Sequence, residues 1–164
     1  MPEDPVKYSR VEEAEKIIHQ LCKKYPDELW TIIPGSVVVL GIENKTRTPS
    51  VKWMARIVTM RGIPREIIAM NKIPVRWAIE LYWKDWNQWK QSLKEWVIFH
   101  ELLHVPEEEG KSVQHDVQDF ALIVDAVGWN WNSKDDLPEL LGAKKVKFNK
   151  DLVPRTREAT QEQK

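Results

Sequence analysis

The stretch "SLKEWVIFHELLHV", residues 92–105, carries two histidines four positions apart in an otherwise largely apolar segment. Ser92 and Glu95 have the S-x-x-E spacing of a capping box, which predicts the start of a helix. Pro106 should end that helix, because the residue before a proline resists the α conformation. The expected helix covers about residues 93–105, and its apolar surface predicts that it is buried.

The spacing of the histidines indicates a metal site. Residues four apart on a helix lie on one face, with Cβ atoms about 5–6 Å apart, so His100 and His104 can both reach one ion. Glu101 lies one residue on, about 100° around the axis, where a carboxylate misses the metal but can accept a proton from a water held there. The alternative is a structural pair of buried histidines. Unpaired buried polar groups are costly, however, and a metal ion would remove that cost.

A catalytic zinc ion usually has three protein ligands and one open position. The longer motif H-E-x-x-H-x-x-G-x-x-H would place the third histidine at position 110, where this chain has Gly110. The remaining candidates nearby are the acidic loop 107–109 and His115. We predict His115, because a second helix that returns after a short loop can present its first turn to the preceding helix. The alternative is a capping or surface histidine.

Two aspartates near His115 are candidates for orienting the metal ligands. Asp119 follows His115 by four residues and would share its face of a helix. Imidazoles that bind zinc normally donate their other N–H to a carboxylate or a carbonyl, so Asp119 could orient His100 or His104. Asp116 is the alternative, and either acid could instead be a simple partner of the helix dipole.

The segments before the motif predict one helix and three strands. Ser9 and Glu12 form another capping box, and apolar residues then recur at helical spacing until Pro26, which predicts a helix over about residues 10–25. Three stretches have the composition or alternation of strands: residues 36–43, 51–62 and 74–83. In the third, the period of two predicts a half-buried strand.

The segments after the motif predict a second helix and a tail. Ser112 suits an N-cap, an apolar stripe follows it, and Gly128 stands where a C-terminal cap is expected. The chain then becomes polar, weakly periodic and locally basic, so we expect much of this part to be disordered. The sequence therefore predicts one domain over residues 1–142 and a basic, disordered tail over residues 143–164.

Length and composition favour a soluble domain. The chain has 164 residues, of which 42% are hydrophobic, and this is enough to build one substantial core. No apolar run approaches the roughly 18 residues that span a bilayer, and the acidic, polar start of the sequence differs from a secretory signal. We therefore expect a cytoplasmic protein that does not contact a membrane. A single cysteine, Cys22, excludes an intrachain disulfide and a cysteine-based zinc site.

The formal net charge is zero, but the charges are segregated along the chain. Residues 45–94 hold eleven Lys and Arg against three acids, whereas residues 107–139 hold two against nine. The basic segment also contains five of the nine tryptophans: Trp53, Trp77, Trp83, Trp86 and Trp89. Interleaved basic and aromatic residues suit a groove for nucleic acid, so a nucleic-acid-binding module with a structural zinc is an alternative function. Two solvated faces of opposite sign would give the same pattern.

The motif and the blocks that follow it resemble a known family. "HELLHV", then "QHDVQDF" and "GWNW", are similar to the phage-type metallopeptidases, which are in turn similar to the SprT and Spartan-like minimal zincins. The resemblance covers about residues 76–131. It implies His100, His104 and His115 as ligands of one Zn²⁺ ion, with Glu101 as general base. It also implies an α+β fold, in which a small twisted, mostly antiparallel sheet packs against an N-terminal helix, the active helix and a following helix.

The resemblance further implies zinc-dependent hydrolysis of peptide bonds in a protein or peptide substrate. Minimal zincins have an edge strand along the cleft, and the strand at residues 74–83 comes just before the active helix, so we expect an extended peptide to pair with its free edge. Tyr82 and Trp83 are then candidate substrate-binding residues, with core packing as the other role of the tryptophan. Because Spartan-like relatives act on DNA-bound proteins, the basic segment 45–94 could serve such a protease.

Overall fold

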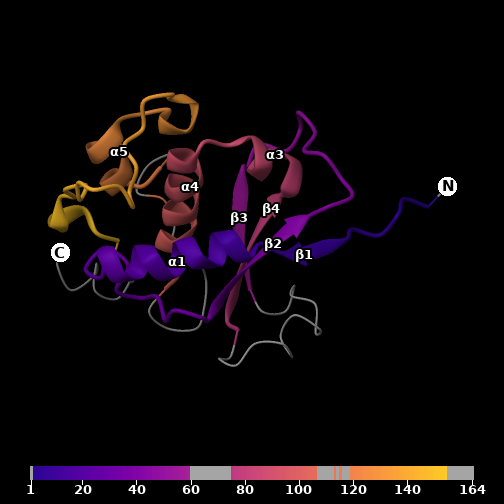
Figure 1. The fold of residues 1–164 in the computed structure, drawn as a ribbon, viewed down its shortest axis with the longest axis horizontal. Coiled ribbons are helices and arrows are strands. Elements are labelled where there is room, and N and C mark those ends of the chain that lie inside the picture. The colour runs from indigo at the N-terminus through magenta and orange to yellow at the C-terminus, as the bar shows by residue number, and fades with distance from the viewer. Residues whose placement is uncertain (1, 60–74, 107–112, 114, 116–118, 155–164) are drawn as a thin grey trace.

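The computed structural model describes residues 2–59, 75–106, 113, 115 and 119–154, and has an α+β architecture with a mixed sheet and helices packed on it (Figure 1). In chain order the elements are β1 (Tyr8–Arg10), α1 (Glu12–Lys24), β2 (Val37–Ile42), β3 (Ala55–Thr59), β4 (Trp77–Tyr82), α3 (Trp83–Gln88), α4 (Gln91–Leu103), α5 (Ala121–Val127), and the 3₁₀ turns η2 (Trp131–Ser133) and η3 (Lys150–Leu152). The expected α+β class, with a small and mostly antiparallel sheet, is confirmed.

The four strands lie in the order β1-β2-β4-β3. The pairs β1–β2 and β3–β4 are antiparallel, and β2–β4 is parallel with Val37 opposite Trp77. β4 is therefore an inner strand, and among the described strands β3 and β1 form the two edges. The prediction that β4 offers a free edge to substrate is wrong, because β4 pairs with β2 on one side and with β3 on the other.

β4 is also buried on both faces, and not on one as predicted. Its odd-numbered side chains join the core beneath the helices, whereas Ala78 belongs to a second apolar cluster with Val38 and Leu40 on the opposite face. Glu80 on that second face is only 4% exposed, and Arg56 satisfies it through an Nε–Oε2 contact of 2.7 Å. The side chains of β4 do alternate between two faces of the sheet, but the face that was predicted to contact solvent is covered by tertiary packing.

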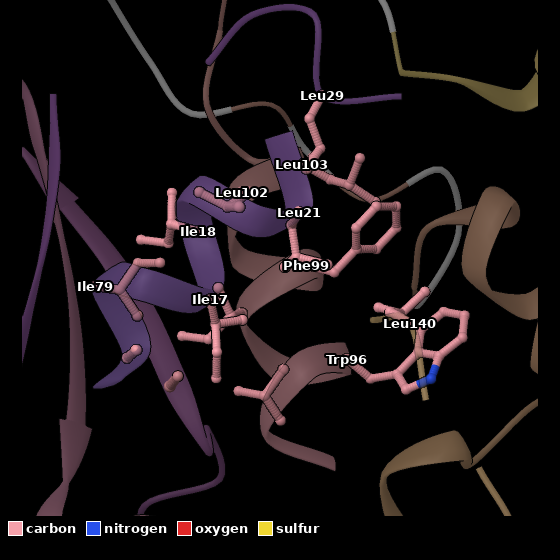
Figure 2. Close-up of a cluster of buried hydrophobic side chains, with 14 of the residues drawn as sticks. Ile17, Ile18, Leu21, Leu29, Ile79, Trp96, Phe99, Leu102, Leu103 and Leu140 are labelled. Carbon is pink, nitrogen blue, oxygen red and sulfur yellow. The ribbon is translucent and has the colours of Figure 1, made fainter. Parts of the chain in front are cut away.

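The main core lies between the sheet and the pair of helices α1 and α4. Figure 2 shows how α1 supplies Ile17, Ile18 and Leu21 to this core, while α4 supplies Trp96, Phe99, Leu102 and Leu103. Helical spacing explains these sets, since residues three or four apart lie on one face. The core fixes α4 firmly against the sheet, which positions the histidines that α4 carries.

Neither predicted capping box forms. Ser9 lies in β1, where its hydroxyl accepts a hydrogen bond from Trp83 Nε1 at 2.6 Å, and the N-cap of α1 is Val11 without a side-chain hydrogen bond. Likewise α4 begins at Gln91, whose cap also lacks such a bond. Ser9 and Glu95, one residue from each predicted box, instead bond to other parts of the fold, and both helices bury one face in the core.

The chain after η2 packs along α4. Buried Glu95 accepts a hydrogen bond from the Leu141 amide at 3.1 Å, and Trp96 Nε1 donates to the Pro138 carbonyl at 2.8 Å. Further on, the ring of Phe148 stacks on Phe99 with centroids 5.0 Å apart. Residues 143–154 thus include ordered side chains that contact the core, although we predicted much of this region to be disordered; residues 155–164 lie outside the described part of the chain.

No helix in the described part of the chain is long and apolar enough to cross a bilayer.

Candidate metal centre

Three histidine rings meet beside α4. His100 and His104 lie at the C-terminal end of this helix, and His115 comes from the connection that follows it. Nε2 of His115 lies 3.1 Å from Nε2 of His100 and 3.1 Å from Nε2 of His104. One ligand atom from each residue fits within 4.8 Å of the other two, so the group can hold a metal ion.

The outer nitrogens of two rings fix which atoms face the centre. Nδ1 of His104 lies 2.6 Å from the carbonyl oxygen of Val113, and since that oxygen can only accept, the proton is on Nδ1. Nδ1 of His100 lies 3.1 Å from Oδ1 of Asp119 without the geometry of a hydrogen bond, and the negative charge of this carboxylate favours a proton on Nδ1. Nε2 of each ring is then unprotonated and carries a lone pair, which is the form of histidine that binds a metal ion.

The donor set fits a zinc ion. In a tetrahedral site with Zn–N bonds of 2.0–2.1 Å, the nitrogens are separated by about 3.3–3.4 Å, close to the 3.1 Å seen here. Without an ion, lone pairs on His100 and His104 would both face His115, which has only one proton to share. Burial lowers the pKa of His104 to about 4, so this ring stays neutral near pH 7 and is ready to coordinate.

His115 reaches the site by a route that differs from the predicted one. Ser112, the predicted N-cap, lies outside the described residues; in the described part that follows, α5 begins at Ala121, and His115 itself is not helical. Instead, the chain is held to α4 by a hydrogen bond from the Val113 amide to the His104 carbonyl at 2.7 Å. Together with the His104 side-chain bond to Val113, this clamp sets where the third ring arrives.

Asp119 lies behind the histidines and accepts from several donors. Besides its contact with His100, it accepts from Trp131 Nε1 and from the Phe120 amide, each at 2.7 Å. Burial opposes its charge, but these donors and His100 lower the pKa of Asp119 below its ordinary value. Asp119 thus lies next to His100, one of the candidate ligands, although it precedes α5 and shares no helix face with His115. Asp116, the alternative, is outside the described residues.

Glu101 lies beside the rings without joining them. Its Oε1 is 3.9 Å from Nε2 of His100, and the residue is only 7% exposed. Burial raises the pKa of Glu101 to about 7, against the lowering effects of His100 and of the hydrogen bond from the Ile57 amide. The amide of an edge-strand residue therefore orients the carboxylate that the motif supplies.

A cavity of about 490 Å³ opens over the three rings. It lies between α4, the edge strand β3 with the residues before it, and the η2 turn, which contributes Trp131 and Asn132. The sequence reasoning did not assign a role to these two residues. The signal that could have found them is the "GWNW" block, since Gly128 and Asn130 both adopt positive φ, at 85° and 56°, and turn the chain back to the site.

A family model described as putative phage metallopeptidase matches residues 6–145, most of the chain. The chain belongs to this family. The matched region contains the whole sheet, α4 and the three histidines, so the phage metallopeptidase assignment and the metal centre support each other. Searches of curated proteins and of solved structures each found no significant match.

Tyr82 and Trp83 do not line the cavity. Trp83 donates to Ser9 on β1 and covers the backbone of Gly41 on β2, towards the edge of the sheet that is opposite β3. Tyr82 stacks on Trp53 with ring centroids 5.3 Å apart. Both residues therefore have packing roles in the structure, and the predicted contact with substrate gains no support.

Proposed function

We propose that this protein is a zinc-dependent peptidase that hydrolyses peptide bonds, with Glu101 as the general base. The observation that supports this most strongly is the geometry of the donor set: three imidazole nitrogens from His100, His104 and His115 converge, and a buried carboxylate lies next to them at an open cavity. A three-histidine set leaves a fourth position for solvent or substrate, as in catalytic zinc sites.

The chain's own residues supply the proton transfer and the orientation. A bound zinc ion contributes Lewis acidity, which lowers the pKa of a water molecule and polarises the scissile carbonyl. Glu101 takes the proton from the attacking water and returns it to the leaving amine. The Ile57 amide and the burial of Glu101 hold this carboxylate in position, and Asp119 keeps His100 in the tautomer with Nε2 free.

The edge strand β3 replaces β4 as the proposed docking strand for a peptide. Ala55, Arg56 and Ile57 of this strand line the cavity together with His100 and Glu101, so β3 borders the metal centre. An extended peptide that adds to this edge would run past Glu101 with its backbone groups paired. The substrate is therefore a protein or peptide segment in extended conformation.

The alternative function, a nucleic-acid-binding module built on residues 45–94, is not favoured. None of the five tryptophans in this segment is among the exposed large side chains, and the Trp53 ring already contacts the ring of Tyr82 and the guanidinium of Arg56. Three of its cations also pair with acids outside the segment, so the charge segregation is partly cancelled in space: Lys45–Glu3, Lys90–Asp135 and Lys94–Glu13. A protease directed to DNA-bound proteins would lack its stacking platform here.

Replacing Glu101 by Gln tests the proposal. The Gln side chain keeps the shape but cannot take a proton, so cleavage of casein or of a peptide library, followed by mass spectrometry, should fall by about 10²–10⁴-fold. One equivalent of zinc should remain bound, since Glu101 is not among the ligands. Glu139→Gln, a matched change at an exposed position outside the cavity, is the control. Equal cleavage by the Glu101→Gln variant and the wild type would disprove the assignment.

A further inference from the structure

We propose that Asn132 is a substrate-positioning residue that hydrogen-bonds the backbone of the bound peptide from the side opposite β3. This inference rests on the proposed peptidase function and names a residue that the H-E-x-x-H motif does not contain.

The polar groups of the cavity wall are mostly committed to other partners. Trp131 Nε1 donates to Asp119, and the guanidinium of Arg56 bonds Glu80 on the far face of the sheet. Lys52 is an exposed side chain with free rotation about its long stem. Asn132 differs from these three, because it carries both a donor and an acceptor on a short side chain.

The backbone that carries Asn132 is firmly held. Asn130 adopts the left-handed conformation at φ 56°, and the Ser133 amide returns to its carbonyl at 3.0 Å. Trp131, the residue before Asn132, is 5% exposed and is anchored to Asp119 through its indole. Asn132 thus directly follows a residue that is anchored to the aspartate beside His100, which fixes its backbone relative to the metal centre.

The side chain of Asn132 has a weak partner that a substrate can displace. Among the described residues its only side-chain hydrogen bond is from Nδ2 to the Met54 sulfur, at 3.6 Å. A thioether is a weak acceptor, so little free energy is lost when this contact opens. Met54 directly precedes β3, and the contact therefore shows that Asn132 reaches across the cavity to the wall formed by the edge strand.

A peptide that lies along β3 has two polar edges. One pairs with β3, and the other faces η2, where its N–H and C=O groups need partners once water has been excluded. An amide side chain is complementary to a peptide group, because it can donate to the carbonyl and accept from the N–H. Asn132 is the group on that wall with the right chemistry and without a strong partner.

Binding of metal-directed inhibitors to the zinc-loaded protein tests this without relying on turnover. Acetohydroxamate contacts the metal centre alone, whereas two alanine peptides, one with a hydroxamate at its C-terminal end and one at its N-terminal end, extend along the cleft to either side. Asn132→Ala should weaken at least one peptide hydroxamate about five- to tenfold, as expected for one neutral hydrogen bond, and leave acetohydroxamate unchanged. Calorimetry measures all three.

Two controls separate this role from a structural one. Ser133→Ala, the next residue on the same turn, and Met54→Leu, which removes the sulfur acceptor at similar volume, should both bind all three probes like the wild type. The proposal is overturned if Asn132→Ala also matches the wild type with both peptides, or if Met54→Leu weakens them equally. Failure of the wild type to bind any hydroxamate would instead contradict the metal site and the peptidase function.

For a cleaved library peptide, the same variant should raise KM with little change in kcat, because a positioning bond is present in ground state and transition state alike. A fall in kcat at constant KM would overturn the positioning role in favour of transition-state stabilisation.

Discussion

Asp119→Asn should weaken zinc binding although Asp119 is not a ligand. Two N–H groups donate to its two oxygens, Trp131 Nε1 and the Phe120 amide at 2.7 Å each, and His100 Nδ1 lies 3.1 Å from Oδ1 without the geometry of a hydrogen bond. Asparagine has the same shape but only one acceptor oxygen, so its NH₂ group must face at least one N–H donor. The imidazole of His100 then loses its fixed tautomer, or the Trp131 turn moves away from it.

The expected size of the effect follows from comparable partners of metal-binding histidines. Loss of such a partner lowers metal affinity by about 10–100-fold, or about 1.4–2.7 kcal/mol. Competition against a fluorescent zinc chelator at fixed pH measures this change directly. The fold should survive, because the substitution removes no buried apolar surface, and urea unfolding of the zinc-loaded protein checks that point.

Asp125→Asn is the matched control, because it is the same substitution at an exposed position on α5 outside the cavity. Its zinc affinity should equal that of the wild type. If the two Asn variants bind zinc within about twofold of each other, Asp119 does not orient His100, and the tautomer argument for the centre fails.

Two further predictions concern the framework of the site. Gly41→Ala should lower the free energy of unfolding in urea by about 1–3 kcal/mol, because the new Cβ would lie within 2.8 Å of Trp83 Cε2. Adding Trp83→Ala to this variant should cost less than Trp83→Ala costs in the wild type. Strictly additive effects of the two changes would contradict the contact. Phe148→Ala should lower the free energy of unfolding by about 2 kcal/mol, because Phe148 stacks on Phe99 and also contacts Tyr25 and Trp96 edge-on. Lys147→Ala, at an exposed position next to it, should leave the stability nearly unchanged. Equal stability of the two variants would mean that this segment does not support the core.

The pattern of charges and aromatic residues was misleading for a physical reason. A count along the chain sums the charges of sequence neighbours, whereas the ion pairs Lys45–Glu3 and Lys94–Glu13 join the basic segment to acids far away in the sequence. The tryptophans of the same segment suggested a stacking surface for nucleic acid as an alternative to core packing. In the fold, Trp86 is fully buried and Trp83 packs over Gly41.

The sequence by itself determined the part of the site that lies within one helical turn. His100, Glu101 and His104 have a fixed relation because the α-helix repeats every 3.6 residues, and this relation holds wherever the helix packs. The existence of α1, β2 and β4 was equally predictable, since apolar periodicity and β-branched composition are local properties.

Only the tertiary structure decided which distant segments join His100, Glu101 and His104 to form the site. It brought His115 to the two helical rings through the Val113 clamp, placed Asp119 behind His100, and made β3 the edge beside Glu101. Each of these depends on strand order or on the path of a connection, and such choices are set by the packing of the whole chain, to which no local periodicity gives access.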